Sequence, residues 1–158
     1  AAVSASLAFR DMTPADVPAV LSIDREAFET PWTAEGFLEC LAGGSRCRVA
    51  FAGKPDDVAG YCITHQALDE AEVYTIAVRR DFRRQGVGRA LLREALEAAR
   101  LNAARVIFLE VRITNASARA LYESEAFQQV GLRRGYYKKA DGSREDAVLM
   151  ARELADAA

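Results

Sequence analysis

The sequence has little histidine, cysteine or lysine. Its 158 residues include one histidine, His65, and three cysteines without C-x-x-C spacing. One histidine cannot build a His-based metal cluster or an evident nucleophile–His pair, and His65 reads most simply as a strand-end residue. An odd, unpatterned set of cysteines argues against a disulfide framework or a zinc site. We therefore expect a cytoplasmic protein that holds no metal.

Long hydrophobic runs and linkers are also missing. No apolar stretch approaches the length of a membrane span, so we expect no membrane partner. Ala1–Ala8 lack the basic region of a signal peptide, and residues 1–6 are expected to form a loose N-terminus. With 51% hydrophobic residues and a net charge of −2, residues 7–154 are expected to form a single soluble domain with its own core.

Most of the basic residues are arginines. Of 21 basic residues only three are lysines, and arginines concentrate around residues 79–89. Guanidinium groups bind phosphate bidentately, so this cluster suits a ligand with several phosphates. Because the chain is mildly acidic and lacks a nucleic-acid module, we expect a small phosphate-bearing cofactor and no nucleic acid.

A glycine-rich turn is the most informative feature that is present. Arg83–Gly88 has the spacing R-x-x-G-x-G, between the strand-like run Val73–Val78 and an amphipathic segment, Val87–Leu101. Unpaired N–H groups and the dipole at a helix start can bind a diphosphate, and glycine lets the backbone approach it. The spacing fits neither the dinucleotide nor the Walker motif. A solvated helix cap is the alternative.

The remaining pattern predicts a mixed α/β domain. The helix at 87–101 should expose Arg93, Glu94, Glu97 and Arg100, and should join two neighbouring parallel strands. The expected strands are 7–10, 46–51, 58–64, 72–78, 105–111, 129–137 and 145–152, and the other helices follow the caps Thr13, Thr33 and Asn115.

A second motif makes a family resemblance specific. Leu109–Asn115 is followed by Ala120–Glu123. With these segments and the glycine turn, the chain resembles the GNAT N-acetyltransferases, and among them the ribosomal-protein-alanine (RimI) branch. The other resembling segments are Pro31–Thr33, Ile76–Val78, Arg133–Tyr137 and Glu145–Ala147. The resemblance implies a mostly antiparallel seven-stranded sheet flanked by four helices, with a splayed parallel pair at the acetyl-CoA site.

The resemblance also implies binding residues. Those expected to hold acetyl-CoA are Ile76, Ala77, Val78, Arg84, Gln85, Gly86, Val87, Gly88, Arg89 and Asn115. Those expected to line the peptide groove are Phe28, Pro31, Trp32, Tyr136 and Tyr137. Helix capping alone would explain Asn115, and ordinary packing would explain the aromatic residues.

Amine acylation needs a base and an acid. An α-amino group has a pKa of about 7.7 to 8.0, so it must lose a proton before it attacks the thioester. By resemblance, Glu110 is the proton acceptor and Tyr122, 12 residues later, is the proton donor to the departing thiolate. The alternative for Glu110 is an ion-pair partner of Arg112 or of another strand-edge arginine, and the alternative for Tyr122 is a core aromatic. Glu72, on the preceding strand, is a rival base.

These features predict an acetyl-CoA-dependent enzyme that acetylates a protein N-terminus, that of an Ala-initiated ribosomal protein of the small subunit. The alternatives are a small-molecule or broad-specificity amine acetyltransferase and a non-catalytic acyl-CoA-binding module. One departure from the family pattern concerns Ala126, where a glycine usually ends the helix. A left-handed backbone there would cost about 1 kcal/mol or more.

Overall fold

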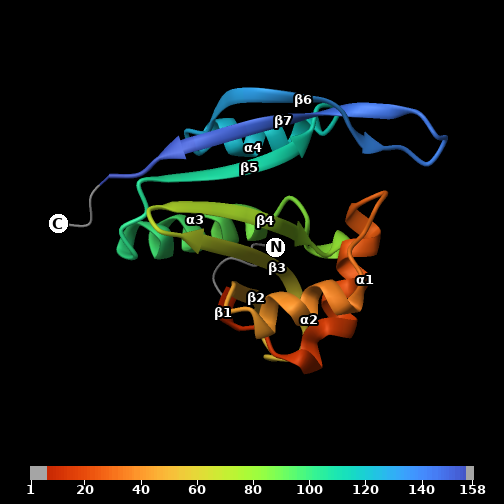
Figure 1. The fold of residues 1–158 in the computed structure, drawn as a ribbon. Coiled ribbons are helices and arrows are strands. Elements are labelled where there is room, and N and C mark those ends of the chain that lie inside the picture. The colour runs from red at the N-terminus through yellow and green to blue at the C-terminus, as the bar shows by residue number, and fades with distance from the viewer. Residues whose placement is uncertain (1–6, 156–158) are drawn as a thin grey trace. The chain divides into compact units, whose positions relative to one another are not determined.

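The computed structural model describes residues 7–155; residues 1–6, expected to form a loose N-terminus, lie outside the described residues. The order of helices and strands is the one expected from the sequence (Figure 1). The elements are β1 (Leu7–Asp11), η2 (Pro14–Asp16), α1 (Val17–Ala27), α2 (Ala34–Ala42), β2 (Arg46–Ala52), β3 (Val58–Ala67), β4 (Glu70–Val78), η3 (Arg80–Phe82), α3 (Val87–Leu101), β5 (Val106–Arg112), α4 (Ala116–Ser124), β6 (Gln128–Lys138) and β7 (Arg144–Glu153).

The strands form one mixed sheet in the order β1-β2-β3-β4-β5-β7-β6. The pairs β1–β2, β2–β3, β5–β7 and β6–β7 are antiparallel. β4 and β5 are parallel, with Glu70–Glu72 in register with Val106–Phe108. The expected seven-stranded mixed sheet and its parallel pair around α3 are therefore confirmed.

The chain divides into two compact units. The first unit runs to His65 and resumes at Tyr74–Ala95, so it contains β1, β2, most of β3, α1, α2, the end of β4 and the start of α3. In it, α1 and α2 lie beside β2 and β3 (Figure 1). Their apolar faces meet the sheet in a core that includes Val20, Ile23, Phe37, Val49 and Tyr61.

The second unit comprises Gln66–Val73 and the chain from Leu96 onward. Its central strand β5 is mostly buried, as expected for a strand that is apolar on both faces. α4 lies alongside β5, β7 and β6 (Figure 1), and its Tyr122 is only 7% exposed. The chain after α4 returns as the β6–β7 hairpin.

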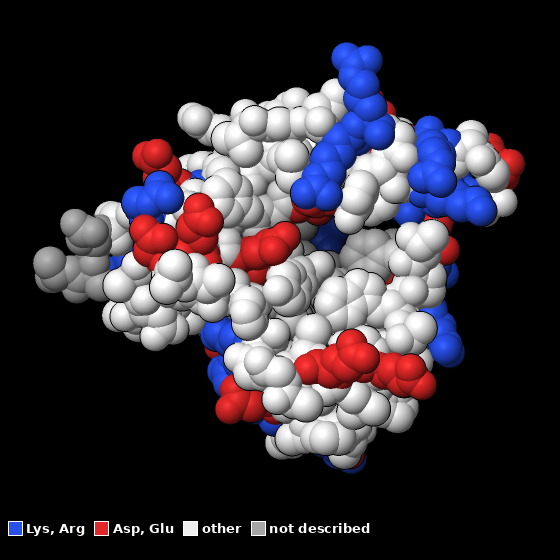
Figure 2. Space-filling model, viewed as in Figure 1, with Lys and Arg blue, Asp and Glu red and all other residues white. Residues whose placement is uncertain are grey.

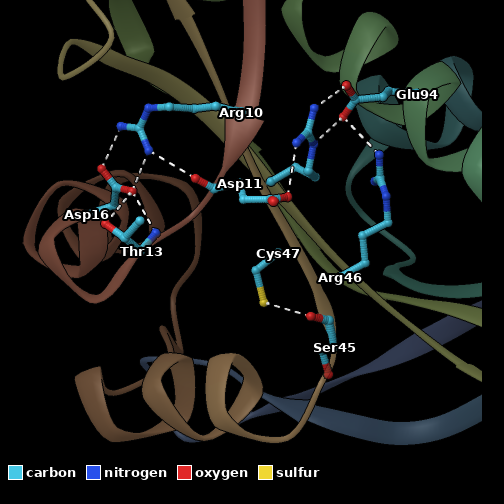
Figure 3. Close-up of polar contacts among 9 residues, drawn as sticks. Arg10, Asp11, Thr13, Asp16, Ser45, Arg46, Cys47 and Glu94 are labelled. Carbon is cyan, nitrogen blue, oxygen red and sulfur yellow. Dashed lines mark hydrogen bonds and ion pairs between the residues drawn. The ribbon is translucent and has the colours of Figure 1, made fainter.

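The outer face of α3 differs from the expectation at Glu94. This carboxylate accepts hydrogen bonds from Arg48 at 3.1 and 3.0 Å and from Arg46 at 3.0 Å (Figure 3). Its side chain is only 22% exposed. The expectation that Glu94 faces solvent is wrong, because two arginines of β2 bind it and thereby attach α3 to the sheet.

Helices α3 and α4 both end in a Schellman motif closed by alanine. After α4, the N–H of Phe127 bonds to the carbonyl of Tyr122 at 3.0 Å, and that of Ala126 bonds to Glu123 at 3.1 Å. Ala126 accordingly has φ 65°, and Ala103 after α3 has φ 62°. The left-handed backbone considered for Ala126 is therefore present, and it is also present at Ala103.

Replacing Ala126 by glycine should stabilise the protein. We expect Ala126→Gly to raise the free energy of unfolding by about 1 kcal/mol, because glycine adopts positive φ without the Cβ clash. Chemical denaturation measures it, and Ala120→Gly is the matched control. Ala120 is exposed within α4, so glycine there should lower stability by about 1 kcal/mol. Loss of stability in both variants would contradict the prediction.

Candidate active site

The glycine turn of the first unit forms the start of α3. Gly86 has φ 83°, and a Cβ there would meet nothing within 4 Å, so its backbone conformation, not crowding, accounts for glycine. Arg84, with φ 62°, is also left-handed, which is uncommon for a residue with a side chain. The Ala90 N–H bonds to the Gly86 carbonyl at 3.0 Å, as the helix begins. N–H groups of the first turn of such a helix lack intrahelical partners and can bind an anion.

One arginine of the cluster is already engaged. Arg79 forms ion pairs with Asp57 at 2.8 Å and Asp81 at 2.7 Å. Its guanidinium also lies over the Phe82 ring, 4.5 Å from the centroid. These contacts brace the segment between β4 and the glycine turn, so Arg79 is better explained by structure than by phosphate binding.

The segment Ile76–Val78 is the end of β4, as expected. Ala77 is buried. A Cβ on Gly60 of β3 would lie 2.9 Å from the Ala77 carbonyl oxygen, so glycine at position 60 allows the two strands to approach closely. The position of this segment thus depends on its neighbour, whereas its contact with acetyl-CoA stays a prediction.

The loop after α1 is held by a buried carboxyl group. Asp24 of α1 is 0% exposed and accepts a hydrogen bond from the Trp32 N–H at 2.7 Å. Its other oxygen accepts a hydrogen bond from the hydroxyl of Tyr61 on β3. Burial raises the pKa of Asp24. The sequence pattern gave no signal for Asp24, although Asp24 holds the Trp32 loop through the Trp32 N–H.

The aromatic residues of this loop are partly core residues. Phe28 and Trp32 are partly buried against the core of the first unit. The Trp32 ring packs on Phe37, with centroids 5.0 Å apart and planes tilted by 33°. One face of the Trp32 ring is therefore used in packing against the core. The neighbouring Pro31 is exposed.

In the second unit, Glu110 lies near the end of β5. Its side chain is 17% exposed, and its Oε1 lies 3.4 Å from Nη2 of Arg133 on β6. Arg133 in turn lies over the Tyr136 ring at 5.1 Å. Of the alternative partners, Arg112 instead bonds to Glu145 at 2.7 Å, whereas Arg133 is a strand arginine of the kind that the alternative reading of Glu110 allowed. Glu72, the rival base, is exposed on β4.

The paired tyrosines of β6 lie near Glu110. The rings of Tyr136 and Tyr137 meet edge to face, with centroids 5.1 Å apart. Burial raises the pKa of Tyr137 to about 12, and the charge of Glu110 adds to that rise. Arg112 lies over the Tyr137 ring at 4.4 Å. The structure thus brings the expected base and two expected peptide-binding residues together in one unit.

Tyr122 and Asn115 lie on α4 of the same unit. Tyr122 is buried and meets Phe127 edge to face, with centroids 5.9 Å apart, so the Schellman motif also helps to hold its ring. Asn115 Oδ1 accepts a hydrogen bond from the Ala118 N–H at 3.2 Å and caps the helix. The capping role of Asn115 is confirmed, and its contact with coenzyme A stays a prediction.

Residues 7–155 show neither a metal-binding cluster nor a membrane-spanning helix. Among residues 7–155, no group of three or more His, Cys, Asp or Glu side chains could hold a metal ion. None of the helices in this range has the length and apolar character needed to span a membrane.

Comparison with known proteins identifies the family. The profile described as "Acetyltransferase (GNAT) family" matches residues 17–127. The chain belongs to the GNAT acetyltransferases. It is an N-acetyltransferase, and the mixed sheet is the GNAT fold.

Several individual proteins and solved structures are similar to this chain. The ribosomal protein bS18-alanine N-acetyltransferase of Escherichia coli (strain K12) is 40% identical over 136 residues, which are 86% of this chain and 90% of that protein. The crystal structure of the ribosomal-protein-S18-alanine N-acetyltransferase from Escherichia coli has a TM-score of 0.86 and 35% identity, with 96% of each chain covered. A complex of Arabidopsis thaliana NAA60 with acetyl-CoA shares the fold at 20% identity, with a TM-score of 0.82 and coverage of 94% of this chain and 98% of that chain.

Asp24 should make stability depend on pH in an unusual direction. Because burial raises its pKa in the folded state, the stability it contributes is present at low pH and is lost as the pH rises from about 4 through the folded pKa. We expect the unfolding free energy of the wild type minus that of Asp24→Asn to decrease over this range. Urea denaturation at a series of pH values measures it.

Asp16 provides a control with the opposite sign. Arg10 donates two hydrogen bonds of 2.7 Å to Asp16 (Figure 3), and they lower the pKa of this carboxyl. The stability that Asp16 contributes is therefore lost as the pH falls below about 4. Parallel pH profiles for the wild type and Asp24→Asn would show that the buried carboxyl is not perturbed.

Proposed function

We propose that this GNAT enzyme transfers the acetyl group of acetyl-CoA to the N-terminal amine of a protein that begins with alanine, such as ribosomal protein bS18. The observation that carries the proposal is the similarity, over most of both chains, to an enzyme named for that reaction. The site of the second unit supports it, because a partly buried carboxylate lies beside paired tyrosines. The corresponding partner is the ribosomal protein in the cytoplasm, with no role for nucleic acid or a membrane.

Acetyl-CoA, when bound, supplies the acetyl group as a thioester. We assign its pyrophosphate to the turn Arg84–Arg89, because N–H groups at the start of α3 can bind an anion and Gly88 carries no Cβ. Its pantetheine arm is assigned to Ile76–Val78, whose backbone would polarise the thioester carbonyl. Asn115 is assigned a further contact with coenzyme A in addition to its capping role.

Glu110 and Tyr122 are assigned the two proton transfers. The attacking amine is largely protonated near neutral pH, so a carboxylate must take its proton. Glu110 is suited to this role because its side chain is mostly shielded and its ion pair is long at 3.4 Å. The Tyr122 hydroxyl would give a proton to the departing thiolate of coenzyme A. Phe28, Pro31, Trp32, Tyr136 and Tyr137 are assigned to the peptide.

A turnover assay tests the proposed function. The enzyme is incubated with acetyl-CoA and one of three acceptors, namely an Ala-initiated peptide, the same peptide beginning with Met, and a polyamine. We expect kcat/KM to be highest for the Ala-initiated peptide, and mass spectrometry to place the acetyl group on its α-amine. Acetylation of the polyamine alone would favour the small-molecule alternative, and no turnover would favour the acyl-CoA-binding module.

Substitution of the two candidate bases tests the chemistry. We expect Glu110→Gln to lower kcat about 100-fold or more while the affinity for acetyl-CoA survives, because the amide keeps the shape but cannot accept the proton. Tyr122→Phe should lower kcat by a similar factor. Glu72→Gln is the matched control on the neighbouring strand. If Glu72→Gln abolishes turnover and Glu110→Gln leaves it intact, the base is Glu72.

A further inference from the structure

A hollow in the first unit has no role in the acetyl transfer described above. Its volume is about 520 Å³, and it lies against α2, the start of β2, and residues of β3 and β4. The residues that line it include Trp32, Glu39, Cys40, Ser45, His65 and Tyr74. It shares Trp32 with the loop assigned to the peptide.

The walls of the hollow are aromatic and held in place. The rings of His65 and Tyr74 are stacked, with centroids 5.7 Å apart and planes 9° apart. The Ser45 hydroxyl lies 3.2 Å from Nδ1 of His65 and fixes that ring. Trp32 is fixed on one side by Phe37 and at its backbone by Asp24. Aromatic faces held in this way attract a cation within about 6 Å of the ring centroid.

The one charged side chain on the lining is acidic. Glu39 is exposed on α2, and among the described residues no ion pair or hydrogen bond engages its carboxylate. α2 carries Glu35 and Glu39 but no lysine or arginine, and Figure 2 shows acidic and uncharged side chains over this helix. A carboxylate beside aromatic rings is complementary to a guanidinium or ammonium group.

We propose that this hollow binds a cationic side chain, arginine or lysine, of the peptide substrate. The inference rests on the proposed function, because it takes the acceptor to be a peptide that passes the Trp32 loop. The cation would lie against the rings of Trp32 and Tyr74 with its charge directed at Glu39. The hollow would thus select a basic residue close to the acetylated N-terminus.

A peptide series tests this specificity. Ala-initiated peptides carry one arginine at positions 2 to 5 in turn, and each is compared with its citrulline counterpart, which has nearly the same shape without the charge. At one position we expect citrulline to lower kcat/KM about tenfold, while the KM for acetyl-CoA is unchanged. In the Glu39→Gln variant this ratio should shrink to about twofold or less.

Glu35→Gln is the matched control, because Glu35 lies on the same helix but does not line the hollow. It should keep the full preference for arginine over citrulline. Equal arginine-to-citrulline ratios in the wild type and in Glu39→Gln at every position would overturn the proposal.

A binding measurement separates this proposal from the proposed function. Trp32 is the one tryptophan of the chain, so its fluorescence reports directly on the hollow. We expect an N-acetylated arginine peptide, which cannot be turned over, to give a saturable change that the citrulline peptide gives about tenfold more weakly. If the arginine peptide binds more tightly than the citrulline peptide but no peptide is acetylated, the proposed role of the hollow is supported and the proposed function fails. If peptides are acetylated but arginine and citrulline peptides differ neither in kcat/KM nor in binding, the proposed function stands and the proposed role of the hollow fails.

Discussion

The first unit is organised around the buried carboxyl group of Asp24. A carboxyl group that is removed from water must find hydrogen-bond partners inside the protein. Its partners come from two other segments, the Trp32 backbone and the Tyr61 side chain. Moving the loop would leave a buried donor and acceptor unpaired, which costs about 1 to 3 kcal/mol. The hollow and the proposed peptide contacts at Trp32 therefore depend on a residue that touches neither ligand.

The order of elements was predictable because its signals are local. Thr33 accepts a hydrogen bond from the Gly36 N–H at 3.1 Å, and Asn115 caps α4 in the same way. Gly44, with φ 80°, follows the end of α2. Hydrophobic periodicity needs only neighbouring residues, so most boundaries are within one or two residues of the prediction. The glycine turn is equally local, because its spacing alone marks the helix start.

What could not be predicted depends on distant residues or on backbone strain. Asp24 and Glu94 each read as a polar residue on a helix, and their partners lie far away in the chain at Tyr61 and Arg48. Ala103 gave no stop signal, because alanine favours helix and seldom adopts positive φ. At Ala126 only the family pattern raised the question, and the next residue, Phe127, packs against Tyr122.

The environment of Glu110 explains why two carboxylates on neighbouring strands are unequal candidates. A base must keep its charge and still be free to take a proton. Arg133 holds Glu110 at 3.4 Å, longer than a charge-assisted hydrogen bond, and the arginine side chain is itself 53% exposed, so this partner is exchanged at little cost. The charge of Glu110 nevertheless acts on Tyr137, whose pKa it helps to raise. Glu72 is exposed, so its carboxylate is solvated by water. Glu110 ranks first because of the family resemblance, and the partial shielding of its side chain is a physical reason in addition.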